Sequence, residues 1–210
     1  MKIDCINSMF TSNCYLVHYN NNVYIIDPSV NINVISKYIK EEESVKGILI
    51  THGHIDHIYY LQEFQNYFDC VIYASSYAKE IIIDNDKNFG CGMGINKQIS
   101  FNPNTFIEVK DNDVILDNVE IISTPGHSLD SICIKIENVL FTGDTLFDSS
   151  IGRWDLYGGD FDILEESLRK LLKYKDLDFY PGHGDKSTIS LQLLTNPYFR
   201  SAVLKNKKSF

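Results

Sequence analysis

Short apolar runs that are followed within a few residues by histidine or aspartate recur along this chain, and they constrain its fold more than any other feature. The run 47–50 leads into Thr51-His-Gly-His-Ile-Asp-His57, and three later runs lead into His127, Asp144 and His183. Such runs are typical of buried strands, whose ends fix the backbone of the residues that follow. We therefore expect separate loops to deliver these side chains to one rim of an α/β fold.

The segment Thr51–His57 is the densest of these groups, with three histidines and one aspartate. Imidazole suits zinc, iron and nickel, and carboxylate suits harder ions, so the mixture fits a borderline divalent metal. A solvated polar turn with incidental histidines is the alternative interpretation. The later motifs argue against it, because His18 is the one histidine outside them. His18 lies in a predicted strand, and we interpret it as structural.

Composition indicates a globular chain, with 44% hydrophobic and 22% charged residues over 210 positions. That length fits one domain over 1–210. The net charge of −9 argues against nucleic acid and anionic membranes as partners. A small-molecule substrate, including an anionic one, remains compatible with it. The sequence leaves the oligomeric state open.

The five cysteines are scattered and form no C-x-x-C pair, which fits neither a disulfide framework nor a thiolate zinc site. The opening MKIDCINSMF lacks the basic and apolar regions of a signal peptide. No apolar run approaches the length of a membrane span. We expect a cytoplasmic protein.

The pattern of apolar residues predicts alternating strands and helices in two β-rich halves, with helices covering one face of each sheet. A hairpin is expected around Asn20-Asn21-Asn22, and Asn85–Asn104 is expected to be a loop near the mouth of the site. Strands are predicted over 14–19, 23–28, 47–50, 70–74, 105–109, 113–116, 119–124, 131–136, 138–144 and 177–180, and helices over 32–40, 58–68, 75–83, 161–174 and 188–194.

The motif THGHIDH resembles the T-H-x-H-x-D-H signature of the metallo-β-lactamase superfamily, and TPGHS, FTGD and PGHG are similar to its later metal motifs. The resemblance begins at SNCYLV and IIDP and covers nearly the whole chain. It implies a four-layered αββα sandwich with two divalent metal ions at one sheet edge. Zinc is the default, with iron or manganese as alternatives.

The resemblance also implies a ligand set. It assigns His52, His54 and His127 to the first metal, Asp56, His57 and His183 to the second, and Asp144 to both.

The segments 142–147 and 151–160 are similar to the short glyoxalase II-like branch, whose members hydrolyse thioesters such as S-lactoylglutathione. Trp154 departs from that pattern, which leaves the substrate preference open. The implied mechanism is attack of a metal-bridging hydroxide on the carbonyl. Asp56 would also hold the proton of the hydroxide, and Asp144 would set the spacing of the metals. A thiolate leaves readily, since the thiol pKa is about 8.5, so no general acid is required.

Several residues near the motifs allow two interpretations. Arg153 and Asp155 either contact substrate or form an ion pair that orders the Asp144 loop. Asp27 is interpreted as a strand-end residue that supports a ligand rather than as a ligand. The role of Cys91, in GCGMG, is a reactive thiol or a plain loop residue.

Other functions of the same fold stay open. A persulfide dioxygenase would hold one iron with His52, His127 and Asp144. A lactonase or β-lactamase-like hydrolase fits the same ligands, because fold and metals do not fix the substrate. An inactive metal-binding scaffold would have lost a ligand, and all seven are present.

The segment after His183 is too short for the helical domain that longer glyoxalase II-like enzymes use to bind glutathione. Its cations, Arg200, Lys205, Lys207 and Lys208, are interpreted as a solvated tail. We therefore expect modest recognition of the glutathione part of a substrate.

Overall fold

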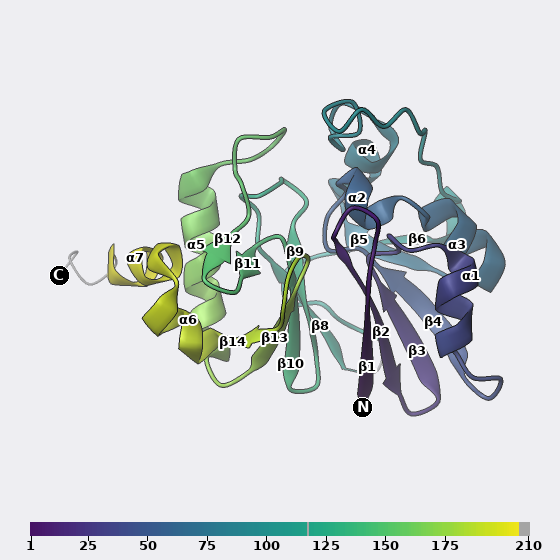
Figure 1. Ribbon diagram of the computed structural model, residues 1–210, viewed down its shortest axis with the longest axis horizontal. Coiled ribbons are helices and arrows are strands. Elements are labelled where there is room, and N and C mark those ends of the chain that lie inside the picture. Colours follow the sequence, from purple (N-terminus) through teal and green to yellow (C-terminus); the bar gives the residue numbers. More distant parts are fainter. Residues whose placement is uncertain (117, 206–210) are drawn as a thin grey trace. The chain divides into compact units, whose positions relative to one another are not determined.

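The computed structural model describes residues 1–116 and 118–205. The chain divides into two compact units, Met1–Val109 and Lys110–Phe210. Each unit contains one six-stranded sheet, and each is described by itself (Figure 1).

The sheet of the first unit has the order β1-β2-β3-β4-β5-β6. Its first three strands pair antiparallel, and β3 to β6 run parallel. The carboxyl ends of β3 and β4 therefore meet at one edge, where Asp27 and Thr51 follow them. The strands are β1 (Lys2–Asn7), β2 (Asn13–Tyr19), β3 (Asn22–Ile26), β4 (Ser44–Leu49), β5 (Ile72–Ser75) and β6 (Phe106–Val109).

The predicted hairpin is confirmed between β2 and β3. Asn20 and Asn21 form its turn with φ of +51° and +59°. Asparagine tolerates this left-handed conformation, which matches the twist of the flanking strands.

Helices of the first unit bury their apolar sides against its sheet, in a core that includes Ile25, Ile48 and Phe64. Figure 1 shows α1, α3 and α4 on the same side of this sheet. The α-helices are α1 (Ile32–Ile35), α2 (Ile55–Ile58), α3 (Leu61–Phe68) and α4 (Ala78–Ile83), with 3-10 turns at Ser36–Tyr38 and Pro103–Thr105.

The sheet of the second unit has the order β14-β13-β10-β9-β8-β7, with β10 and β13 parallel and the other pairs antiparallel. A separate hairpin joins β11 and β12. The strands are β7 (Val114–Ile115), β8 (Val119–Ser123), β9 (Ile132–Ile136), β10 (Val139–Gly143), β11 (Leu146–Phe147), β12 (Ser150–Ile151), β13 (Asp178–Pro181) and β14 (Ser187–Thr188).

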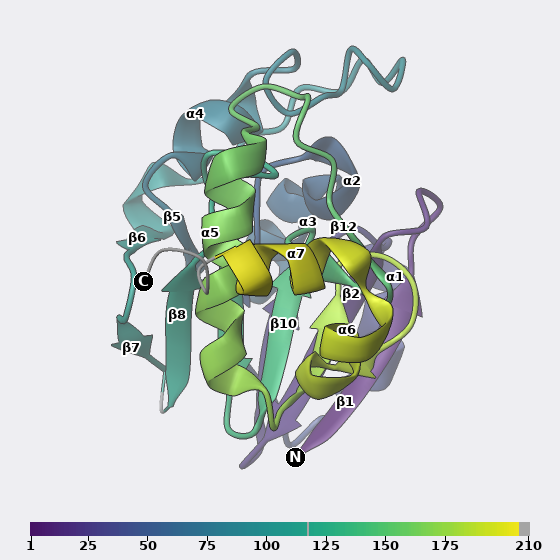
Figure 2. The ribbon, with the colours of Figure 1, turned by 90° about the vertical axis from the view of Figure 1, so that its left-hand side faces the viewer.

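Helix α5 (Phe161–Leu171) runs along one face of this sheet, as Figure 2 shows. It buries Leu164, Leu168 and Leu171, and the Asp160 side chain accepts a hydrogen bond from the Ile163 amide at its start. The helix predicted over 161–174 is thus confirmed, with its last turn as a 3-10 helix at Leu172–Tyr174. Helices α6 (Ile189–Thr195) and α7 (Pro197–Lys205) follow on the same face.

The interpretation of the C-terminal segment as a solvated tail was wrong over 197–205, because α7 packs on α5 and β12 there. Its Phe199 and Ala202 are fully buried. Lys207 and Lys208 lie outside the described residues.

Strand β1 and the β11–β12 hairpin were not predicted either. Among the described residues, no helix is long and apolar enough to cross a membrane.

Candidate metal centre

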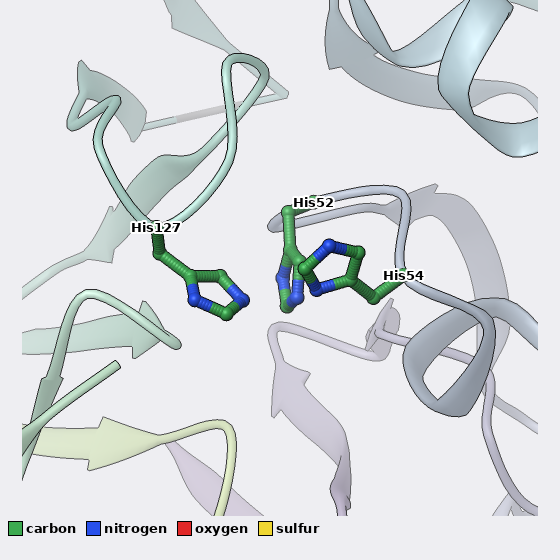
Figure 3. Close-up of side chains that lie close together, drawn as sticks. All are labelled: His52, His54 and His127. Atoms are coloured by element: carbon green, nitrogen blue, oxygen red, sulfur yellow. The ribbon is translucent and has the colours of Figure 1, made fainter. Parts of the chain in front are cut away.

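The first unit gathers four of the proposed ligands on the turn after β4. His54 precedes the first residue of α2, and Asp56 and His57 lie within that helix. The three imidazoles on the turn are at most 4% exposed. The ring of His52 lies 4.7 Å from that of His54 and 4.3 Å from that of His57, measured between centroids. Figure 3 shows the first of these pairs, with His52 and His54 on the same loop.

Asp27 supports this turn from the end of β3. Its Oδ1 accepts from the Thr51 amide at 2.8 Å, and its Oδ2 accepts from Thr51 Oγ1 at 2.6 Å. Oδ2 also lies 2.9 Å from His57 Nδ1, which fixes the ring and directs Nε2 away from Asp27. Asp27, His52 and His57 could by distance form a metal group of their own. The three bonds to Asp27 instead favour its interpretation as a support for a ligand.

Asp56 lies beside His57 at the start of α2. The Asp56 Oδ2 to His57 Nε2 distance is 3.5 Å, too long for a good hydrogen bond. Two ligand atoms that each lie about 2.0–2.2 Å from one tetrahedral ion are separated by about 3.5 Å. Ser12 Oγ donates to the Asp56 backbone oxygen at 2.5 Å, which ties the turn to the β1–β2 loop.

The second unit gathers the other three proposed ligands after β8, β10 and β13. Asp144 Oδ2 lies 3.6 Å from His127 Nε2 and 3.6 Å from His183 Nε2. Both distances match the spacing of ligand atoms around an ion. His127 is 2% exposed, and the His183 side chain is 28% exposed. One carboxylate oxygen therefore faces two imidazole nitrogens, as a ligand shared by two ions would.

His127 is oriented through the nitrogen that faces away from Asp144. Its Nδ1 lies 2.6 Å from the backbone oxygen of Arg153, an acceptor that fixes the ring and leaves Nε2 for other contacts. Figure 3 shows His127 on the loop that bears it. A Cβ at Gly152 would lie 1.9 Å from the Asp144 carbonyl oxygen and 2.9 Å from His127 Nδ1. Glycine is required there because the chain passes directly against both ligands.

Arg153 pairs with Asp155 through two hydrogen bonds, from Nε at 2.7 Å and from Nη2 at 2.9 Å. This guanidinium lowers the pKa of the Asp155 carboxyl to about 2. The geometry fits the interpretation as an ion pair that orders a loop. The loop holds His127 through the Arg153 carbonyl.

The donor sets of both units suit a borderline divalent metal, since each combines imidazole nitrogen with carboxylate oxygen. The sequence indicated that the Asp27 carboxylate supports a ligand, because this aspartate stands at the end of a predicted strand. The support by the Arg153 carbonyl had no such signal, because any residue type offers a backbone oxygen.

The family model described as the metallo-beta-lactamase superfamily matches residues 8–183. The chain belongs to that superfamily. It is 32% identical over 200 residues to the hydroxyacylglutathione hydrolase GloC of Haemophilus influenzae, covering 91% of this chain and 94% of the relative. It is 30% identical over 194 residues to the probable metallo-hydrolase YqgX of Bacillus subtilis, covering 89% and 92%.

Two solved structures have the same fold as this chain. The B3 metallo-beta-lactamase BLEG-1 superposes with a TM-score of 0.83 at 26% identity, covering 94% of this chain and 99% of the other. TTHA1623 in a di-iron-bound form gives 0.82 at 25% identity, covering 93% and 99%. These matches confirm the predicted fold class, and the chain is a metallo-hydrolase of this superfamily.

Proposed function

We propose that the protein hydrolyses thioesters, such as S-lactoylglutathione, with two divalent metal ions. His52, His54 and His127 would hold one ion, Asp56, His57 and His183 would hold the other, and Asp144 would contribute to both. The observation that carries this proposal is the equal spacing of Asp144 Oδ2 from the Nε2 atoms of His127 and His183, which belong to different ions in this assignment.

When bound, two such ions lower the pKa of a water molecule toward neutrality and polarise the carbonyl of the substrate. The Asp56 carboxylate accepts the proton of the attacking water in a hydrogen bond and orients that water. Asp144 keeps the donor groups of the second unit at a fixed spacing. A thiolate is a good leaving group, since the thiol pKa is about 8.5, and it takes its proton from water after it departs, so the chain needs no general acid.

The similarity to a hydroxyacylglutathione hydrolase supports a thioester substrate. The similarity to BLEG-1, a metallo-beta-lactamase, favours a second candidate, hydrolysis of a β-lactam by the same ligands. A lactone fits these ligands as well, because fold and metals do not fix the substrate. We expect zinc in both positions, and the similar di-iron form of TTHA1623 makes iron the first alternative. A small-molecule substrate and a cytoplasmic location belong to the same proposal, with no nucleic acid and no membrane as partners.

The test starts from metal content, followed by a panel of S-lactoylglutathione, a smaller lactoyl thioester, a lactone, a β-lactam and glutathione persulfide. We expect two ions per chain and turnover of thioesters that a chelator abolishes. One ion and oxygen uptake with the persulfide would identify a dioxygenase instead. Preference for the lactone or the β-lactam would support the second candidate.

Two variants test the assignment of Asp144. Asp144→Ala should lower kcat/KM by at least about a thousandfold, or about 4 kcal/mol of transition-state stabilisation, because two ions would lose a shared carboxylate. Arg153→Ala keeps the backbone oxygen that holds His127, so we expect a loss of about tenfold or less. Equal losses in the two variants at equal metal content would contradict these roles.

A further inference from the structure

The loop between α4 and β6 contains a phenylalanine in a backbone conformation that residues with a Cβ rarely adopt. Phe89 has a φ of +64°, in the left-handed region. Strain of this kind persists where surrounding contacts hold it, and it gathers at functional sites. The contacts of Phe89 therefore indicate what the strained residue serves.

The ring of Phe89 lies beside a proposed metal ligand. Its centroid is 6.5 Å from that of the His54 imidazole, with 54° between the planes. His54 also contacts the ring of His52 edge to face, at 81° (Figure 3). Two rings, Phe89 and His52, thus limit the rotation of the imidazole.

The residue before Phe89 is bonded to the same turn. The Asn88 backbone oxygen accepts from the Ile55 amide at 2.9 Å. Ile55 is the first residue of α2, and its N–H has no acceptor within the helix. The Asn88 side chain is buried, donates to the Ile82 oxygen and accepts from the Gly90 amide. This network fixes the place where Phe89 approaches His54.

The glycines of this loop make the arrangement possible. A Cβ at Gly92 would lie 2.1 Å from Cε2 of Phe89, and one at Gly90 would lie 2.1 Å from Oδ1 of Asn85. Gly92 therefore packs directly against the Phe89 ring, and Gly90 packs against the Asn85 side chain. The GCGMG segment thus contacts the ring beside His54 through Gly92.

We propose that Phe89, held in place by Asn88, is a positioning residue that sets the orientation of the His54 imidazole for metal binding. The proposal rests on the proposed function, in which His54 is a ligand. Without the ring, the imidazole rotates more freely and must be ordered when the ion binds. Residues that orient metal ligands typically change metal affinity by about 10- to 100-fold.

The experiment measures cobalt(II) affinity by competition with a chelator, together with the visible absorption spectrum of the cobalt protein. Phe89→Ala and Phe89→Gly should both weaken binding by at least about tenfold and alter the spectrum. Glycine adopts the left-handed conformation without strain, so F89G removes the ring while it relieves the backbone. Phe89→Tyr keeps the ring and should restore the affinity and spectrum of the original protein.

A matched control is Phe101→Ala. Phe101 is also a partly buried phenylalanine of the first unit, but its ring packs on Phe106, at 4.7 Å between centroids. F101A should leave cobalt affinity and spectrum unchanged. Cobalt binding by F89G as tight as in the original protein would overturn the proposal, as would an equal loss in F101A.

The His54→Ala variant separates failure of this proposal from failure of the proposed function. If H54A binds cobalt as tightly as the original protein, His54 is not a ligand and both assignments are wrong. If H54A binds weakly and F89G binds normally, the ligand assignment stands and the role of Phe89 is rejected.

Discussion

Three of the proposed histidine ligands are oriented through the ring nitrogen that would face away from a metal. His57 Nδ1 lies against the Asp27 carboxylate, His127 Nδ1 against the Arg153 carbonyl, and His52 Nδ1 against Thr51 Oγ1 at 3.1 Å. An acceptor at one nitrogen keeps the proton there and leaves the other nitrogen with its lone pair. The neighbours therefore prepare each ring for binding before any ion arrives.

The Asp27 carboxylate should matter for both stability and metal binding. Asp27→Ala leaves the buried Thr51 and His57 donors without this acceptor, so we expect a loss of about 3 kcal/mol in the free energy of unfolding. Metal affinity should fall by about 10- to 100-fold. Urea unfolding of the metal-free protein and competition with a chelator measure the two effects. Asp27→Asn keeps an acceptor oxygen and should lose less stability and less metal affinity. Equal losses in the two variants would argue against this role of the Asp27 carboxylate.

The sequence indicated the proposed ligands more clearly than the groups that orient them. His and Asp at strand ends form a visible pattern, because few other sites need that density of ligand types. Of the acceptors that orient the rings, Asp27 could be recognised from the sequence by its place at a strand end. Arg153 could not, because it acts through its backbone oxygen. The Phe89 contact has no sequence signal, since a positive φ at phenylalanine follows from tertiary packing.

At the scale of elements, the sequence missed helix α7 and the very short strands β11 and β12. Helix α7 carries a start signal, since the Asn196 side chain accepts from the Tyr198 and Phe199 amides and Pro197 follows as the first helical residue. Its buried positions, Phe199 and Ala202, are three residues apart, as one helix face requires. The cations at the end of this segment led to its interpretation as a solvated tail, although the spacing of its apolar residues fits a helix.

Truncation of the buried ring on α7 tests whether this helix belongs to the core of the second unit. Phe199→Ala should lower the free energy of unfolding by about 3–5 kcal/mol, because it opens a cavity among fully buried side chains. Leu194→Ala, at a position that is 73% exposed on α6, is the matched control and should change it by about 0.5 kcal/mol or less. Urea unfolding measures both. If Phe199→Ala changes the free energy of unfolding as little as Leu194→Ala does, α7 is dispensable for the fold.

At the scale of the whole molecule, the proposed ligands divide between the two units. The first unit contributes His52, His54, Asp56 and His57, and the second contributes His127, Asp144 and His183. Each unit orients its own ligands with its own hydrogen bonds, so each set is prepared without the other. Under the proposed assignment, the stabilising effect of metal binding should be measurable in residues of both units.

Amide hydrogen exchange with and without zinc tests this coupling. At a zinc concentration about 100 times Kd, openings that release the ions should become about a hundredfold rarer. We expect slower exchange around 51–58 in the first unit and around 126–128 and 143–145 in the second. Asp144→Ala should reduce the protection in both units, because its carboxylate would contact both ions in the proposed assignment. Protection confined to 51–58 and the Asp27 region would instead mean that Asp27, His52 and His57 bind the metal within the first unit alone.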